Sequence, residues 1–161
     1  MQKKIRVLFV CLGNICRSPA AEGALKNLVA QKNLQHLFHI DSCGTAAYHI
    51  GELPNANTRK IAKGKGITLD HRARQFEKAD FDNFDYILAM DQSNYNDVLA
   101  LATSQEHKQK VFKFRHFDQQ HQNMDVPDPY FGGLDGFVEV QEIVERTSQG
   151  FLQHIHAKQE L

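Results

Sequence analysis

Short apolar runs alternate along the chain with amphipathic segments, and this alternation predicts the fold. Residues 5–10 are nearly all apolar and rich in branched side chains, which is typical of a strand buried inside a sheet. From residue 19 apolar positions recur at helical spacing, which predicts a helix over about residues 19–32. The same two patterns predict further strands over residues 38–43, 85–90 and 110–114, helices over residues 57–65 and 92–102, and a long final helix from Asp135 onward.

Strands that alternate with helices favour a parallel sheet covered on both faces. We therefore expect residues 1–161 to form one α/β domain of three layers. A four-stranded parallel sheet would carry helices on both faces, in a flavodoxin- or Rossmann-like arrangement. Ligands of such folds bind at the carboxyl ends of the strands. Residues 115–133 are polar and irregular and predict a long loop.

The composition narrows the function classes. The 161 residues include 42% hydrophobic and 24% charged side chains, as in ordinary globular domains. Nineteen basic and nineteen acidic residues give a net charge of zero, which argues against a general nucleic-acid or anionic-membrane binder. No apolar run approaches the roughly 20 residues of a membrane span, and the N-terminus lacks the pattern of a signal peptide. With only three cysteines, a cytoplasmic protein with reduced thiols is expected.

Residues 11–18, Cys-Leu-Gly-Asn-Ile-Cys-Arg-Ser, connect the first predicted strand to the first predicted helix. Backbone N–H groups of such a loop can turn inward around an anion, and the helix N-terminus adds partial positive charge. Gly13 permits a close backbone approach to a ligand, and Arg17 offers a planar fork that matches two phosphate oxygens. Ser18 followed by Pro19 predicts the N-cap and first turn of the helix.

Cys11 is the candidate nucleophile of this loop. In the field of the helix N-terminus and an arginine, a cysteine is expected to be largely thiolate and placed to attack the phosphorus of a bound ester. The loop lacks the Gly-Lys-[Ser/Thr] ending of a nucleotide triphosphate site and the glycine pattern of a dinucleotide site. Cys11 and Cys16 could instead be buried small side chains, and without a second cysteine pair they would make a poor zinc site.

Asp128-Pro129-Tyr130 in the long loop supplies the second candidate element. A phenolate leaving group needs a proton, which a positioned carboxylic acid can donate. The proline stiffens the backbone beside the acid, and Tyr130 could form an aromatic wall for a ring-bearing substrate. Taken alone, this triplet is more often an ordinary turn.

Together these segments resemble the low-molecular-weight protein tyrosine phosphatases. Residues 10–19 match the family's signature, Asp128-Pro129-Tyr130 stands where the family has its acid, and residues 41–42 and 85–91 also look like family segments. The resemblance spans roughly residues 5–157. It implies a metal-independent, cofactor-free hydrolase whose partner is a phosphotyrosine-containing protein or peptide, and we expect it to act as a monomer.

The resemblance implies a two-step reaction. Cys11 attacks phosphorus to form a cysteinyl-phosphate, while Arg17 and the loop N–H groups hold the equatorial oxygens. Asp128 protonates the leaving tyrosine and then, as carboxylate, activates the water that frees phosphate. Ser18 would hydrogen-bond the departing thiolate.

Further residues match the family in other roles. Cys16 matches a second cysteine able to form a reversible disulfide with Cys11, which would make the enzyme redox-sensitive. A related arginine phosphatase branch carries Thr where this chain has Ile15, so Ile15 favours phosphotyrosine. The family's phosphate-binding loop is matched by Leu12, Gly13, Asn14, Ile15, Cys16 and Ser18. The network that shapes this loop is matched by Asn14, Ser18, Ser42 and His71. The walls of the substrate pocket are matched by Leu12, Tyr48 and Tyr130.

Other activities use the same scaffold. Besides an arginine phosphatase, a thioredoxin-linked arsenate reductase starts from the same loop but needs a distal cysteine pair, and no cysteine follows Cys43. A non-catalytic phosphoprotein-binding module is the alternative outside the enzymes. The presence of nucleophile, arginine and acid disfavours it, and release of free phosphate would exclude it.

Overall fold

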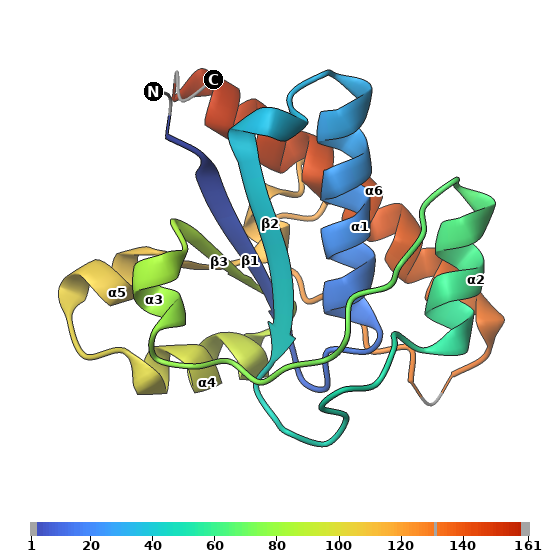
Figure 1. The fold of residues 1–161 in the computed structure, drawn as a ribbon, viewed down its shortest axis with the longest axis horizontal. Coiled ribbons are helices and arrows are strands. Elements are labelled where there is room, and N and C mark those ends of the chain that lie inside the picture. The colour runs from blue at the N-terminus through green and yellow to red at the C-terminus, as the bar shows by residue number, and fades with distance from the viewer. Residues whose placement is uncertain (1–2, 131, 159–161) are drawn as a thin grey trace.

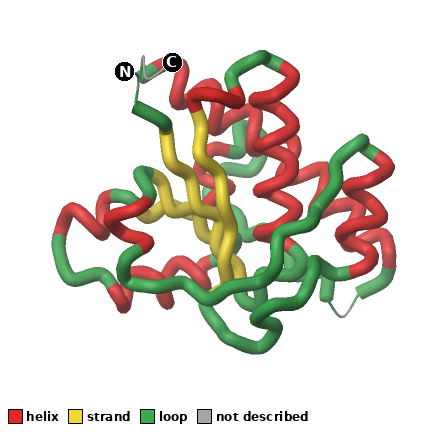
Figure 2. Tube along the Cα trace, in the orientation of Figure 1, coloured by secondary structure: helices red, strands yellow, loops and turns green. Residues whose placement is uncertain are grey.

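A parallel sheet lies at the centre of the molecule (Figures 1 and 2). The computed structural model describes residues 3–130 and 132–158. The strand order is β2-β1-β3-β4, and every neighbouring pair is parallel. The strands are β1 (Ile5–Cys11), β2 (Phe38–Gly44), β3 (Tyr86–Ala89) and β4 (Val111–Lys113). The predicted four-stranded parallel sheet is thereby confirmed.

Helices cover both faces of this sheet (Figure 1). On one side lie α1 (Arg17–Gln31), α2 (Ala56–Gly64) and α6 (Leu134–Ala157). On the other side lie α3 (Asp80–Asn83), α4 (Gln92–Leu101) and α5 (Gln105–Gln109). Two 3₁₀ turns, η1 (Gln35–Leu37) and η2 (Phe114–Phe117), complete the described elements. The three layers expected from the sequence are present. No helix in the described ranges has the length and apolar character needed to cross a membrane.

Strand β1 explains why both faces must be covered. Successive side chains of a strand point to opposite faces. Val7 and Phe9 belong to the apolar core shared with α1 and α6, while Leu8 and Val10 belong to the core on the α4 side. All four are fully buried, so the continuous apolar run of residues 7–10 marks a central strand.

The start of α1 differs from the prediction. The helix begins at Arg17, its N-cap position is Cys16, and no side chain caps it. The prediction that Ser18 caps the helix was wrong, because its hydroxyl bonds to Asn14 and lies against the sulfur of Cys11. Pro19 is the third helical residue, where the missing N–H would have had no helical partner.

Other differences concern short elements. Helices α3 and α5 were not predicted, because segments of four and five residues are too short to show a periodic pattern. The fourth strand is one residue shorter at each end than residues 110–114, and η2 begins at Phe114, the last residue of the predicted strand, and continues into the predicted loop. Strand β3 is one residue shorter at each end than residues 85–90.

The long connection after β4 is anchored by a buried carboxylate. Asp118 is 1% exposed, and its carboxylate lies 2.9 Å from both Arg115 Nε and Arg146 Nη2. Arg115 also donates to the carbonyl of Asp125. Further along, the N–H of Val126 donates to the carbonyl of Met90 at 2.7 Å, just beyond β3. The loop that carries Asp128 is therefore fastened beside the carboxyl ends of the strands.

Candidate active site

The loop from β1 to α1 has its carbonyls turned outward. Carbonyl oxygens of Cys11, Leu12 and Ile15 accept hydrogen bonds from the N–H groups of residues 45, 46 and 55, all outside the loop. In a trans peptide the following N–H points the opposite way, so the N–H groups of residues 12, 13 and 16 face the interior of the loop. The N-terminus of α1 follows immediately. This arrangement is a receptor for an anion.

Cys11 lies at the centre of that loop. It is 3% exposed, and its sulfur lies 3.0 Å from the hydroxyl of Ser18. The N–H of Asn14 donates to the same sulfur at 3.3 Å. The sulfur therefore lies beside one backbone donor and one hydroxyl that can donate to it, which suits a leaving thiolate.

Asn14 holds the loop in shape. Its φ of +59° is the left-handed conformation, which asparagine tolerates better than most residues. Its Nδ2 donates to the hydroxyls of Ser18 (2.8 Å) and Ser42 (3.0 Å). Its Oδ1 accepts from the N–H of Arg74 (3.1 Å) and from His71 Nε2 (3.2 Å). The structure thus brings together the four residues expected to form the loop-shaping network.

Glu22 extends this network and was missed in the sequence. It is 5% exposed on α1, and its carboxylate accepts the hydroxyl proton of Ser42 at 2.5 Å. Lys26 binds its other oxygen at 2.6 Å. A signal was present, because Glu22 lies in the apolar stripe of the helix, between Ala21 and Leu25.

One group among the described residues has possible metal ligands close together. Atoms of Glu22, Asp41 and His71 lie within 4.8 Å of one another. The carboxylates already have cationic partners, since Lys26 pairs with Glu22 and Arg74 lies 3.1 Å from Asp41. The group is accounted for as an ion-pair network behind the loop.

Arg17 is a buried, tightly held cation. It is 3% exposed, and its Nη1 donates to Asp91 Oδ2 at 2.7 Å and to the carbonyl of Val126 at 3.1 Å. Its Nη2 lies 3.7 Å from Asp128 Oδ2. Burial opposes its charge, but the neighbouring Cys11, Asp91 and Asp128 outweigh burial and raise the pKa of Arg17. The guanidinium is therefore a permanent positive charge beside the sulfur.

Asp91 was not predicted as a site residue. It immediately precedes α4, and its second oxygen accepts from the N–H of Asn94 at 2.7 Å, so the same carboxylate caps a helix and orients Arg17. An aspartate between a strand and a helix predicts a cap from sequence. Its contact with a residue 74 positions away could not be predicted.

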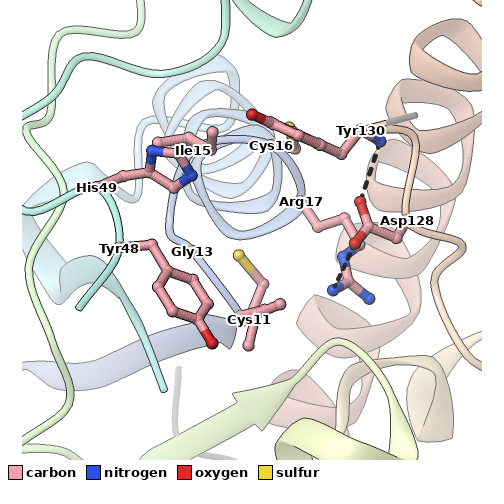
Figure 3. Close-up of a pocket in the computed structure, with 10 residues that line it drawn as sticks. Cys11, Gly13, Ile15, Cys16, Arg17, Tyr48, His49, Asp128 and Tyr130 are labelled. Atoms are coloured by element: carbon pink, nitrogen blue, oxygen red, sulfur yellow. Dashed lines mark hydrogen bonds and ion pairs between the residues drawn. The ribbon is translucent and has the colours of Figure 1, made fainter. Parts of the chain in front are cut away.

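Asp128 stands at the mouth of the site, with its side chain 44% exposed (Figure 3). One carboxylate oxygen accepts from the N–H of Tyr130 at 3.0 Å. The next residue, Pro129, packs beside Gly136 at the start of α6. The acid is therefore held by a short turn and reaches back toward Arg17.

The sulfur of Cys11 opens into a pocket of about 210 Å³ (Figure 3). Figure 3 shows Tyr48 and His49 on the side of the pocket opposite Asp128. Asn14, Ser18, Ser42 and His71 do not line it, while the expected wall residues do. His49 was missed, because nothing in the sequence distinguishes it from other loop histidines. The lining residues are Cys11, Leu12, Gly13, Ile15, Cys16, Arg17, Tyr48, His49, Asp128 and Tyr130.

The three cysteines are free thiols and differ in environment. Burial, together with the nearby Cys11 and Asp128, raises the pKa of Cys16 to about 12, although Thr58 and Arg17 act in the opposite direction. Burial also raises the pKa of Cys43 well above its usual range. Cys16 and Cys43 therefore keep their protons at neutral pH and do not compete with Cys11 as nucleophiles.

Comparisons with known proteins identify the family. A family model described as "Low molecular weight phosphotyrosine protein phosphatase" matches residues 6–161. The protein of that name from Schizosaccharomyces pombe is 44% identical over 156 residues, covering 96% of this chain and 99% of the relative. The crystal structure of a protein tyrosine phosphatase from Entamoeba histolytica has a TM-score of 0.92 and 39% identity, covering 97% of this chain and 99% of that one. A Drosophila arginine phosphatase has a TM-score of 0.86 and 34% identity, covering 93% and 97%. The chain belongs to the low molecular weight phosphotyrosine protein phosphatase family.

Proposed function

We propose that this protein hydrolyses phosphotyrosine in proteins, and small aryl phosphates, through a cysteinyl-phosphate intermediate. One observation carries the proposal: the sulfur of Cys11 opens into a pocket that also presents inward N–H groups, the fixed guanidinium of Arg17 and the carboxyl group of Asp128. Nucleophile, anion receptor and proton donor are the three parts that phosphoester hydrolysis requires.

In the first step the sulfur of Cys11 attacks phosphorus. The S–P bond forms while the bond from phosphorus to the tyrosine oxygen breaks, and Asp128 donates a proton to that oxygen. The loop N–H groups and Arg17 bind the three equatorial oxygens, whose charge changes during transfer. Because Asp91 and Val126 hold the guanidinium in advance, little reorganisation is needed.

In the second step water attacks the phosphorus of the intermediate. Asp128, now a carboxylate, accepts a proton from the water, and the S–P bond breaks to release inorganic phosphate. The leaving thiolate receives the N–H of Asn14 and the hydroxyl of Ser18. Since Asn14 donates to the Ser18 oxygen, the serine's own proton is available for the sulfur or for the carbonyl of Cys43.

The pocket walls support an aryl substrate. Leu12, Tyr48 and Tyr130 surround the entrance with apolar and aromatic surface, which suits the ring of a phosphotyrosine. Ile15, 8% exposed, adds an aliphatic wall where the arginine phosphatase branch carries a hydroxyl. Arginine phosphatase is the second candidate, since a solved relative has that name.

The test is phosphate release from a phosphotyrosine peptide with a metal chelator present. We expect turnover by the parent, none by Cys11→Ser, and a kcat lowered by about 10²- to 10³-fold in Asp128→Ala. The defect of Asp128→Ala should shrink with p-nitrophenyl phosphate, whose leaving group hardly needs a proton. A parent that binds the peptide without releasing phosphate would contradict the proposal, and faster release from phosphoarginine would reassign the substrate.

A further inference from the structure

A rigid turn at the rim of the pocket carries His49. The N–H of Glu52 donates to the carbonyl of His49 at 2.9 Å, and Gly51 supplies the required positive φ of +85°. Two backbone bonds fasten the turn to Ala73, from the N–H of Gly51 to its carbonyl (2.8 Å) and from its N–H to the carbonyl of Glu52 (2.9 Å). The turn is therefore part of the scaffold of the site.

The ring of His49 lies against the phosphate-binding loop. A Cβ atom placed on Gly13 would lie 2.9 Å from His49 Cδ2 and 3.7 Å from Nε2, so the absence of a side chain at Gly13 makes room for this edge of the ring. In Figure 3 the ring stands across the pocket from Asp128. The Nε2 edge thus faces a place where substrate enters.

Glu52 determines what that edge can do. Its carboxylate lies 2.8 Å from His49 Nδ1 and can only accept, so Nδ1 carries a proton. Nε2 is then either a bare acceptor or, in the imidazolium, a charged donor. The other groups facing this region are the ring of Tyr130, 6.1 Å away between centroids, the carboxylate of Asp128 across the pocket, and Arg72, which donates to the carbonyl of Gly51.

We propose that His49, oriented by Glu52, selects substrates with an acidic residue next to the phosphotyrosine, and does so in its protonated form. The inference rests on the proposed function. The floor of the pocket takes the phosphoryl group and the walls take the aromatic ring, so the neighbouring residues of a peptide pass over the rim. There a protonated His49 attracts a carboxylate, while Asp128 repels it from the opposite side. A neutral imidazole has no such preference for a carboxylate over an amide.

The experiment compares two phosphotyrosine peptides that differ only in Glu or Gln beside the phosphotyrosine. The peptides are compared at pH 5.5 and at pH 8, on either side of the range in which histidine side chains commonly change charge, and the glutamate is ionised at both. We expect the ratio of the Glu-peptide KM to the Gln-peptide KM to be about three- to fivefold lower at pH 5.5 than at pH 8, with similar kcat. Comparing the two peptides at each pH cancels the titration of the catalytic groups.

Three variants assign the effect. His49→Gln should make the KM ratio of the two peptides the same at both pH values, and Ile50→Gln, on the same turn but outside the pocket, should keep the difference seen in the parent. Glu52→Gln keeps an acceptor for Nδ1 and removes a negative charge beside the rim, so the relative KM of the Glu peptide should still fall at pH 5.5. A pH dependence of the KM ratio that survives in His49→Gln, or a parent ratio that is equal at pH 5.5 and 8, overturns the proposal.

Binding of the same peptides to Cys11→Ser, measured by calorimetry, separates the two proposals. If the parent releases no phosphate, the proposed function fails, and the ratio of dissociation constants still tests His49. If the parent turns over both peptides with the same KM ratio at pH 5.5 and at pH 8, the function stands and the role of His49 is refuted.

Discussion

Asp91 offers a sharp test of how the site is organised, because its two oxygens have different tasks. One holds Arg17 Nη1 at 2.7 Å and the other caps α4 through Asn94. In Asp91→Asn only one of the two atoms is an acceptor. If the amide oxygen keeps the cap, where asparagine is favourable, the amide nitrogen faces a guanidinium that can only donate. The variant therefore loses the Arg17 contact and keeps the helix.

The expected magnitude follows from that lost contact. A hydrogen bond to a charged group contributes about 1.5–3 kcal/mol. The carbonyl of Val126 still holds the same nitrogen of Arg17, so the guanidinium becomes less ordered without leaving the site. Since about 1.4 kcal/mol corresponds to a tenfold change in rate, kcat/KM should fall about 10- to 100-fold.

The assay is steady-state hydrolysis of p-nitrophenyl phosphate, with thermal unfolding measured on the same samples. Asp125→Asn is the matched control: Asp125 accepts from the N–H of Gln92 beside the same helix start and pairs with Lys113, without touching Arg17. This control tests whether loss of a nearby negative charge is sufficient to lower kcat/KM. A kcat/KM of Asp91→Asn within twofold of the parent, or an equal loss in Asp125→Asn, would refute the reasoning.

Three further predictions concern packing, thiol chemistry and acid stability. Gly44→Ala would place a methyl group 2.6 Å from the carbonyl oxygen of Leu12, so the loop must shift; urea unfolding should show a loss of about 1–3 kcal/mol, and kcat should fall with it. Iodoacetamide at pH 7 should modify Cys11 and spare Cys16, whose pKa is about 12. Mass spectrometry of the labelled chain identifies the modified cysteine, and modification of Cys16 instead of Cys11 would contradict the prediction. Asp118→Asn should destabilise the fold by about 3–5 kcal/mol at pH 7. Burial opposes ionisation of Asp118, but its arginine partners lower its pKa below the usual range. The parent therefore keeps this contribution to stability above about pH 4 and loses it only in stronger acid. An Asp118→Asn variant as stable as the parent at pH 7 would contradict the prediction.

The pattern of hydrophobic and polar residues along the chain was sufficient to predict the sheet and the principal helices. The run of residues 7–10 is apolar on both faces, and only a central strand of a covered sheet needs that pattern. Helices α3 and α5 lay beyond such reasoning, because each depends on tertiary packing rather than on a periodic face of its own.

The candidate site divides in the same way. Cys11 and Arg17 are close in sequence, so a strand–loop–helix segment alone predicts that they meet. Asp91 and His49 approach the loop through contacts between distant segments, and such contacts leave no local signal. The prediction for Ser18 was wrong for a related reason. Its position in the sequence suggested a helix cap, but its hydroxyl lies against the sulfur of Cys11.

The left-handed Asn14 has a consequence for protein engineering. Residues 10–19 are the most recognisable part of the sequence, yet the conformation at Asn14 is maintained by Ser42, His71 and Arg74, which come from other parts of the chain. A peptide of residues 10–19, or a graft of them onto another strand–helix junction, would carry the motif without the restraints that shape it. The portable unit is a discontinuous one, in which residues 42–44 and 71–74 must travel with the loop.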